Sequence, residues 1–426
     1  MKRSKQITNR ICGLDLCTTS AAIAFATSLL VAATQAQAQT FTVLHNFTGS
    51  DGSAPEATLT LDRAGNLYGT TIGGGRYNYG TVFKMTRRES GWALTSIYEF
   101  NNYPTGANPA APVVFGPDGA LYGSTHGGGS GPGVVFKLQP PAAFCPTVSC
   151  PWTETVLADF NFTHGTPSSP SGPLSFDAAG NIYGTSELGG DYNECLAGGL
   201  GCGTVYELTK SNSWAVTTLH AFTSGADGQY PGGGVVLDQA GNLYGTVPEN
   251  DFQNDGGDVF ELTPSGSGWA FNSLFQFSCD DDGCATSAGL LFDQAGNLYG
   301  ATTHGGSGDG GTVFQLSPSG GSWNFNLLFS LTGSGGFDGP ESALIMDTAG
   351  NLYGTTIADG SHGNGNVFKL TPSNGGYTYT SLHDFSGGSD GATPSGGLAM
   401  DASGNLYGTT VYGGSTGHGV VFEITP

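Results

Sequence analysis

The 426-residue chain has little positive charge. It carries 12 Lys and Arg against 34 Asp and Glu, a formal net charge of −22. A surface of this sign repels nucleic acid and anionic lipid, so neither is expected as a partner. It can attract cations, although an acidic, well-solvated shell that keeps an exported protein soluble accounts for the charge equally well.

The sequence also lacks a hydrophobic segment long enough to span a bilayer. Its longest apolar stretch, Ala21 to Ala33, has 13 residues, follows four basic residues and precedes the small-x-small sequence Ala36-Gln37-Ala38. This order is typical of a secretory signal peptide, which we place at residues 1–38. The remaining chain has 8 Lys and Arg and 33 Asp and Glu, a net charge of 8 − 33 = −25. With no anchor pattern at the C-terminus, we expect a secreted, extracellular protein.

No Cys-x-x-Cys occurs, and no histidine lies within five residues of the six cysteines that follow the signal peptide. This disfavours zinc. The cysteines form three local pairs, and in an exported chain such spacing favours disulfides between neighbours. The predicted disulfides are Cys145–Cys150, Cys195–Cys202 and Cys279–Cys284.

Catalytic and cofactor motifs are missing as well. The glycine runs at 73–75 and 127–129 open no helix and lack the Lys-Ser/Thr of a phosphate loop. No strand-to-helix turn is expected that could hold a Gly-x-Ser-x-Gly nucleophile. The segment from Asp251 to Gly256 begins like a calcium loop, but its twelfth position is Leu262. We therefore assign no catalytic residue and no cofactor, with calcium or another divalent cation as the remaining candidate.

What the chain has in abundance is a repeat. The sequence Gly-Asn-Leu-Tyr-Gly-Thr-Thr at 65–71 recurs in similar form six more times, at steps of 54, 61, 61, 55, 54 and 54 residues between its tyrosines. A fixed period of this length indicates a repeat architecture. The tyrosines are Tyr68, Tyr122, Tyr183, Tyr244, Tyr299, Tyr353 and Tyr407.

Each repeat is predicted to form four strands, here called A to D. In the first repeat they cover residues 57–61, 67–71, 81–86 and 93–100. Between A and B, Asp62 can accept backbone N–H bonds, and Gly65 can take a left-handed conformation. The tryptophans share one position before the centre of strand D, which favours a packing role. The strand B glycines, such as Gly69, are expected where neighbouring sheets approach closely.

The ends of the chain complement one another. Residues 41–47 form a D strand with no A, B and C before it, and residues 420–424 form a C strand with no D after it. Pairing of these strands would close a ring of 28 strands. The sequence thus predicts an all-β, seven-bladed β-propeller with four antiparallel strands per blade, in a single domain over residues 41–426. A linear β-solenoid is the alternative.

Propeller geometry brings the B–C and D–A loops together on one face, around the mouth of the axial channel. His126 and His304 are interpreted as sharing one position in the B–C loops, and His362 and His418 lie in other B–C loops. Histidines that converge there can bind a metal, although no spacing enforces it.

Acidic and aromatic residues gather in the same loops. Carboxylates beside flat rings suit sugar hydroxyls and ring faces, or calcium, although ordinary exposed loops also look like this. The candidate ligand-binding residues are Glu187, Asp191, Tyr192, Glu194, Asp251, Phe252, Asp255 and Asp281.

The repeated pattern Gly-Asn-Leu-Tyr-Gly-Thr-Thr followed by Gly-Thr-Val-Phe-Lys-Leu-Thr-Pro resembles the GloVer (Gloeo/Verruco) tandem repeat of choice-of-anchor bacterial surface proteins. The resemblance covers nearly all of residues 41–426 and implies an exported bacterial protein of unestablished activity. The Asp-x-x-Gly-Asn-Leu-Tyr hairpin is also similar to NHL and lactonase-type propellers.

These observations predict a non-catalytic extracellular binding module, monomeric, that takes a glycan or a protein through the B–C/D–A face. One alternative is a propeller enzyme, a lyase or a metal-dependent lactonase, with loop histidines and acids near the channel. Another is a purely structural surface-layer or adhesion component.

Overall fold

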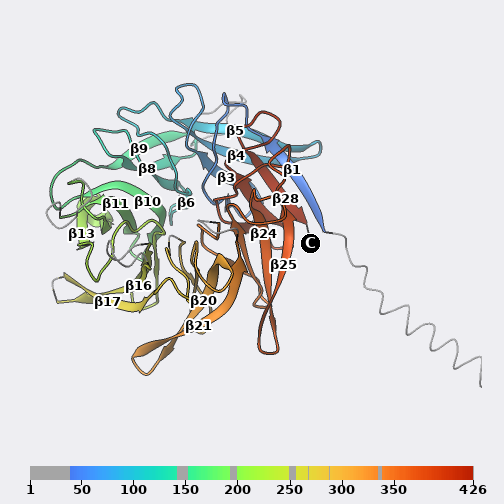
Figure 1. Ribbon diagram of the computed structural model, residues 1–426. Helices are drawn as coiled ribbons and strands as arrows, with labels where there is room; N and C mark the ends of the chain where they lie inside the picture. Colours follow the sequence, from blue (N-terminus) through green and yellow to red (C-terminus); the bar gives the residue numbers. More distant parts are fainter. Residues whose placement is uncertain are drawn as a thin grey trace, which may run out of the picture. The chain divides into compact units, whose positions relative to one another are not determined.

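The structure, a computed structural model, describes residues 39–141, 152–191, 199–248, 256–266, 268–286, 288–333 and 338–425. Residues Phe41–Thr425 form one compact unit. Within it, seven four-stranded antiparallel sheets follow one another around a ring (Figure 1). The unit is a seven-bladed β-propeller, as predicted.

Six blades use consecutive strands, and the seventh combines the two ends of the chain. Blade 1 contains β2 (Thr60–Leu61), β3 (Leu67–Thr71), β4 (Thr81–Arg88) and β5 (Gly91–Glu99). Blade 2 contains β6 (Val114–Phe115), β7 (Leu121–Thr125), β8 (Val134–Gln139) and β9 (Thr153–Asp159). Blade 3 contains β10 (Pro167–Phe176), β11 (Ile182–Gly189), β12 (Thr204–Thr209) and β13 (Ala215–Ala221), with the short 3₁₀ helix η1 (Lys210–Asn212) between the last two. Blade 4 contains β14 (Val235–Leu237), β15 (Leu243–Val247), β16 (Asp258–Ser265) and β17 (Gly268–Gln276). Blade 5 contains β18 (Leu291–Phe292), β19 (Leu298–Ala301), β20 (Asp309–Ser319) and β21 (Ser322–Thr332). Blade 6 contains β22 (Ile345–Met346), β23 (Leu352–Thr356), β24 (Asn366–Ser373) and β25 (Gly376–Asp384). Blade 7 contains β26 (Ala399–Met400), β27 (Leu406–Thr410), β28 (Val420–Thr425) and β1 (Thr40–Asn46).

The ring closes where the sequence predicted. The seventh sheet has the order β1-β28-β27-β26, so the first strand of the chain is the outer strand of the last blade. Beyond β1, the backbone N–H of Phe47 donates to the Gly419 carbonyl at 3.1 Å. Closure of this kind pairs strand edges that a linear array would expose, and it excludes the solenoid alternative.

The A–B hairpins are held by their aspartates. Asp62 accepts hydrogen bonds from the backbone N–H groups of Ala64 and Asn66, from the Asn66 side chain and from the Tyr68 hydroxyl. Burial acts to raise the pKa of Asp62, but these hydrogen bonds outweigh it and lower the pKa below its ordinary value. The predicted turn role of this aspartate is confirmed.

Tryptophan and tyrosine rings pack between blades. Trp92 of blade 1 meets Tyr407 of blade 7 at a centroid distance of 5.8 Å, and Trp152 of blade 2 meets Tyr68 of blade 1 at 6.1 Å. Because each tryptophan packs on the strand B tyrosine of the preceding blade, their predicted role in packing is confirmed.

Glycine is required in strand B for a different reason from the one predicted. A Cβ at Gly69 would lie 2.5 Å from the ring of Phe83, which is the cross-strand partner of Gly69 within the same blade. The glycine makes room for this ring and not for a neighbouring blade. Phe136, Phe260, Phe314, Phe368 and Phe422 cover their partner glycines in the same way.

Candidate functional site

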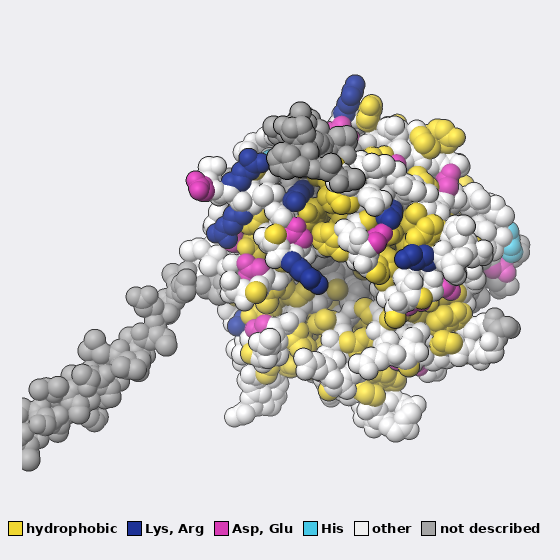
Figure 2. Space-filling view, turned by 180° about the vertical axis from the view of Figure 1, so that it is seen from behind, with side chains coloured by type: hydrophobic (Ala, Val, Ile, Leu, Met, Phe, Trp, Pro, Cys, Tyr) yellow, Lys and Arg dark blue, Asp and Glu magenta, His cyan; other side chains and the backbone are white. Residues whose placement is uncertain are grey.

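Charge divides the propeller between its two faces. We call the side with the B–C and D–A loops the loop face, and the side with the A–B and C–D hairpins the hairpin face. Of the eight Lys and Arg after residue 38, only Arg76 lies in a B–C or D–A loop. The other seven lie toward the hairpin face, where Figure 2 shows basic side chains around a central hollow. The loop face is therefore predominantly acidic.

A cavity of about 210 Å³ lies where the segments entering the seven A strands meet. Most of its lining residues are Gly, Ala, Ser or Pro, so the walls offer mainly backbone and small side chains. Three glutamates break this pattern, namely Glu56, Glu187 and Glu341. The cavity thus concentrates negative charge near the axis.

Two of these glutamates influence each other. Burial raises the pKa of Glu56, and the charge of Glu341 raises it further. Burial also raises the pKa of Glu341. The Glu341 side chain is accessible to solvent, but it lines the cavity inside the ring of blades. Carboxyl groups of this kind keep their protons to higher pH, or recruit a cation that stabilises their charges.

Sequence reasoning missed Glu56 and Glu341, although a signal was present. Both follow a proline immediately before strand A, as Pro55-Glu56 and Pro340-Glu341. The corresponding positions of the other five blades carry only small residues, Ala110, Ser171, Gly232, Ser287 and Ser395.

Two predicted residues meet beside this cavity. The Nε2 atom of His126, from blade 2, lies 3.2 Å from the Oε2 atom of Glu187, from blade 3. The hydrogen bond with Glu187 raises the pKa of His126, against the opposing effect of burial. A second pair is formed by His164 and Asp191, whose Nε2 and Oδ1 atoms are 3.0 Å apart. Glu187 and Asp191 therefore both lie on the loop face, each beside a histidine.

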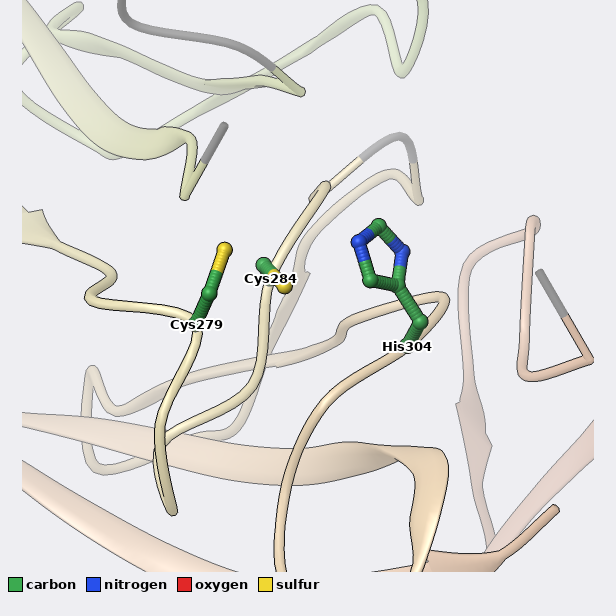
Figure 3. Close-up of side chains that lie close together, drawn as sticks. All are labelled: Cys279, Cys284 and His304. Carbon is green, nitrogen blue, oxygen red and sulfur yellow. The ribbon is translucent and has the colours of Figure 1, made fainter. Parts of the chain in front are cut away.

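The four histidines proposed as metal ligands do not converge. His126 pairs with Glu187, the Nδ1 atom of His418 lies 2.9 Å from Ser53 Oγ, and His362 is exposed. His304 lies instead beside two cysteines, Cys279 and Cys284 (Figure 3). Within the described ranges, this is the only group of three or more metal-binding side chains.

His126 and His304 also do not share a position, contrary to the prediction. The B–C segment of blade 2 pairs with the preceding loop through Ala107 and Gly127, whereas blade 5 uses Cys284 and His304. The residue equivalent to His304 is therefore Gly127, and His126 lies one position before it. Successive residues of an extended segment point to opposite sides, so the two side chains point differently.

The three predicted disulfides have different outcomes. Cys202 is disulfide-bonded, and its predicted partner Cys195 lies outside the described residues, as do Cys145 and Cys150. Cys279 and Cys284 are not joined to each other in the structure, and His304 shares their site. Asp281 is exposed between them. The predicted ligand residues Tyr192, Glu194, Asp251, Phe252 and Asp255 lie outside the described residues.

Exposed aromatic side chains concentrate on the loop face. Of the eight large hydrophobic residues that are exposed in the described ranges, six lie in B–C or D–A loops and only Val216 and Leu327 lie in outer strands. Tyr103 is 70% exposed and Tyr412 is 59% exposed. Such rings are more costly to leave in water than polar residues, which marks the face as a candidate for binding. The six are Tyr77, Tyr79, Tyr103, Phe162, Leu200 and Tyr412.

Within the described residues, no helix has the length and apolar character needed to cross a membrane.

Two solved structures with TM-scores above 0.5 share the fold. The extracellular domain of a putative one-component system from B. thetaiotaomicron has a TM-score of 0.54 and 12% identity, covering 91% of this chain and 42% of that one. PorZ, a surface component of the type-IX secretion system of Porphyromonas gingivalis, has a TM-score of 0.51 and 12% identity, covering 90% and 48%. The chain spans less than half the length of each. A gluconolactonase from Xanthomonas campestris has a TM-score of 0.43 and 11% identity, covering 93% and 92%.

No curated protein matches the chain. The family model described as the Gloeobacter/Verrucomicrobia repeat matches residues 16–149, 144–337 and 249–426, which together cover all seven blades. The protein is therefore a member of the Gloeobacter/Verrucomicrobia repeat family.

Proposed function

We propose that the protein is an extracellular binding module that holds a polysaccharide against its loop face. The observation that carries the proposal is the concentration of exposed aromatic rings on this face, next to acidic loops. A flat ring packs against the apolar face of a sugar, and neighbouring carboxylates accept hydrogen bonds from its hydroxyls.

The exposed rings occupy one continuous arc of the face. Tyr412 belongs to blade 7, Tyr77 and Tyr79 to blade 1, Tyr103 to the connection from blade 1 to blade 2, and Phe162 to the next connection. These blades follow one another around the ring, so the rings can contact successive sugar units of one chain. Only Arg76 contributes positive charge in these loops, which favours a neutral or cationic polysaccharide over an anionic one.

Location outside the cell is supported by two fold neighbours, one an extracellular domain and the other a bacterial surface component. It also agrees with the signal peptide expected at residues 1–38.

The test is binding of the purified chain to an array of neutral, cationic and anionic polysaccharides, followed by calorimetry on any that bind. Tyr103→Ala and Tyr412→Ala are each expected to weaken binding about tenfold, the usual effect of removing an aromatic anchor. Leu327→Ala is the matched control, because Leu327 is also exposed but lies in the outer strand β21. A blank array, or binding that neither tyrosine variant weakens, would contradict the proposal.

A second candidate function is favoured by the paired glutamates of the axial cavity. Two carboxyl groups with raised pKa values are suited to general acid and base steps, as in a lyase or a hydrolase. In this case Glu56 and Glu341 would act on a polysaccharide or a lactone that enters the cavity. Mass spectrometry of such substrates after incubation would show products that Glu56→Gln and Glu341→Gln abolish. If the substrates are unchanged after incubation, the enzymatic function is contradicted and the binding function is not.

A further inference from the structure

The loop face carries a second site that is separate from the aromatic arc and the axial cavity. We propose that Cys279, Cys284 and His304 bind one zinc ion, with three protein ligands and an open fourth position. The ligands come from the loop between β17 and β18 and from the loop between β19 and β20. One sulfur from each cysteine and one ring nitrogen of His304 all lie within 4.8 Å of one another (Figure 3).

These separations are close to what zinc requires. Zinc–sulfur bonds of about 2.3 Å in a tetrahedral arrangement place two sulfur ligands about 3.8 Å apart, with sulfur and nitrogen slightly closer. The ligand atoms are at most 4.8 Å apart, so side-chain movements of about 1 Å would bring them to the separation that zinc requires. Two thiolates and one imidazole with an open position form a common zinc ligand set, and thiolate favours zinc over calcium.

Backbone pairing fixes the two loops relative to each other. Cys284 and His304 are antiparallel partners, with the Cys284 N–H donating to the His304 carbonyl at 2.8 Å and the His304 N–H donating back at 3.3 Å. Directly opposed residues of an antiparallel pair project their side chains to the same side. The Gly306 N–H also donates to the Asp280 carbonyl at 2.9 Å. The ligands are therefore held together by the fold before any metal binds.

Cys279 is brought over by a tight turn. Its φ of 64° is left-handed, and the turn is closed by Asp282, which accepts hydrogen bonds from the Ser278 backbone and hydroxyl at 3.1 and 2.8 Å. The exposed carboxylates of Asp280 and Asp281 stand in the same turn and add negative charge that attracts a cation.

The orientation of His304 is also set. The Thr303 hydroxyl donates its single proton to the Ala285 carbonyl at 3.2 Å, and its oxygen lies 3.2 Å from His304 Nδ1. With that proton committed, the hydroxyl can only accept from Nδ1–H. A neutral His304 then carries its lone pair on Nε2, and Figure 3 shows a ring nitrogen on the side of the cysteines. A hydrogen bond to the far nitrogen that fixes the tautomer is typical of metal-binding histidines.

The other blades provide an internal comparison. Gly387 and Ala392 stand at the positions of Cys279 and Cys284 in the loop that follows blade 6, and Tyr412 stands at the position of His304 in blade 7. Gly387 is left-handed like Cys279, and Ala392 pairs with Tyr412 as Cys284 pairs with His304. The same backbone thus exists without the ligands, which shows that the fold does not need them.

This comparison supplies substitutions that the fold already accepts. Cys279→Gly, Cys284→Ala and His304→Tyr each install the residue found at the corresponding position near blade 7. The full chain would be reduced with a phosphine, which returns any Cys279–Cys284 disulfide to two thiols, then exposed to zinc and desalted. Zinc per chain would be measured by mass spectrometry, with cobalt as a spectroscopic substitute. Thermal melting would verify that each variant is folded.

We expect one zinc per chain, a thiolate-to-cobalt charge-transfer band, and loss of both in all three variants. Thr303→Val, which copies Val411, is expected to weaken zinc binding at least about tenfold because it frees the histidine tautomer. The combined variant Gly387→Cys, Ala392→Cys and Tyr412→His is expected to bind a second zinc. Gln229→Ala, at the position of Cys284 in another loop, is the neutral control.

Three results would overturn the proposal. The first is a reduced chain that binds no zinc. The second is zinc that remains in folded Cys279→Gly, Cys284→Ala and His304→Tyr chains, because the metal would then lie elsewhere. The third is a folded combined variant that stays at one zinc.

Discussion

Asp258 should lower the free energy of unfolding at neutral pH, compared with acidic pH. It begins β16 and is completely buried, and its Oδ2 atom accepts a hydrogen bond from the Ser273 hydroxyl at 2.5 Å. Its other carboxylate oxygen has no hydrogen-bond partner in the described part of the chain. In blade 1 the same position is Thr81, whose hydroxyl meets that of Thr71 across the strands. Asp258 instead faces Val247, which has no hydroxyl to offer.

The cost follows from the pKa of this group. Burial raises the pKa of Asp258 from 3.8 to about 7. Because the folded state holds its proton more tightly than the unfolded state, no stability is lost below pH 4, and the loss grows as the pH rises to about 7. At about 1.4 kcal/mol per pH unit, the loss is about 2 kcal/mol near pH 5 and about 4 kcal/mol near pH 8.

Asp258→Asn removes the charge and copies Asn366, which holds this position in blade 6. The variant should unfold at higher guanidinium concentration than the wild type, with a larger advantage near pH 8 than near pH 5. Tryptophan fluorescence during guanidinium unfolding at the two pH values measures the stability of each variant and its dependence on pH. The reverse substitution, Asn366→Asp, should destabilise the chain with the same pH dependence. The reasoning fails if Asp258→Asn is no more stable than the wild type near pH 8, or if its advantage does not change with pH.

Three further predictions concern the hairpins, the core and the loop face. Asp347→Ala should lower stability by about 2 kcal/mol at neutral pH, because four hydrogen bonds to a carboxylate are lost. Since the pKa of Asp347 is lowered in the folded state, the difference should shrink as the pH falls below about 4, which melting curves at several pH values would show. Gly354→Ala places a Cβ 2.6 Å from the strand C ring and should cost about 1–3 kcal/mol in denaturant unfolding, whereas Gly268→Ala meets nothing within 4 Å and should be neutral. Glu187→Gln should lower the pKa of His126 toward its ordinary value in an NMR titration, and an unchanged pKa would show that the 3.2 Å contact does not form in solution.

The fold could be predicted from the sequence because its determinants are local and repeated. The hairpin aspartate, its glycine and the tyrosine all lie within seven residues, as in Asp62, Gly65 and Tyr68, so each copy reports the same structure independently. Ring closure followed from simple counting of strand types. The reason for Gly69 was predicted wrongly, because the order of strands does not reveal which ring covers a glycine.

The candidate sites could not be predicted to the same depth, because their residues meet only through the ring. Glu56 and Glu341 belong to blades 1 and 6, far apart in the sequence, and their interaction depends on closure. His304 and Cys284 meet through the register of two loops. The additional threonine before His304, compared with the segment before His126, shifts the register by one residue. A one-residue shift reverses the side on which a residue lies, and the repeat pattern alone does not show it.

The position of β1 in the last blade has a consequence for biosynthesis. Its partner strand, β28, is the last strand of the propeller to be synthesised. Until then, every shorter nascent chain has two unsatisfied sheet edges, one at each terminus, and the longest-range contact of the molecule forms last. Such late contacts slow folding and leave exposed edges open to association with other chains. A prematurely terminated chain is therefore an open array of blades and not a smaller closed propeller. The cell can recognise its exposed strand edges and degrade it.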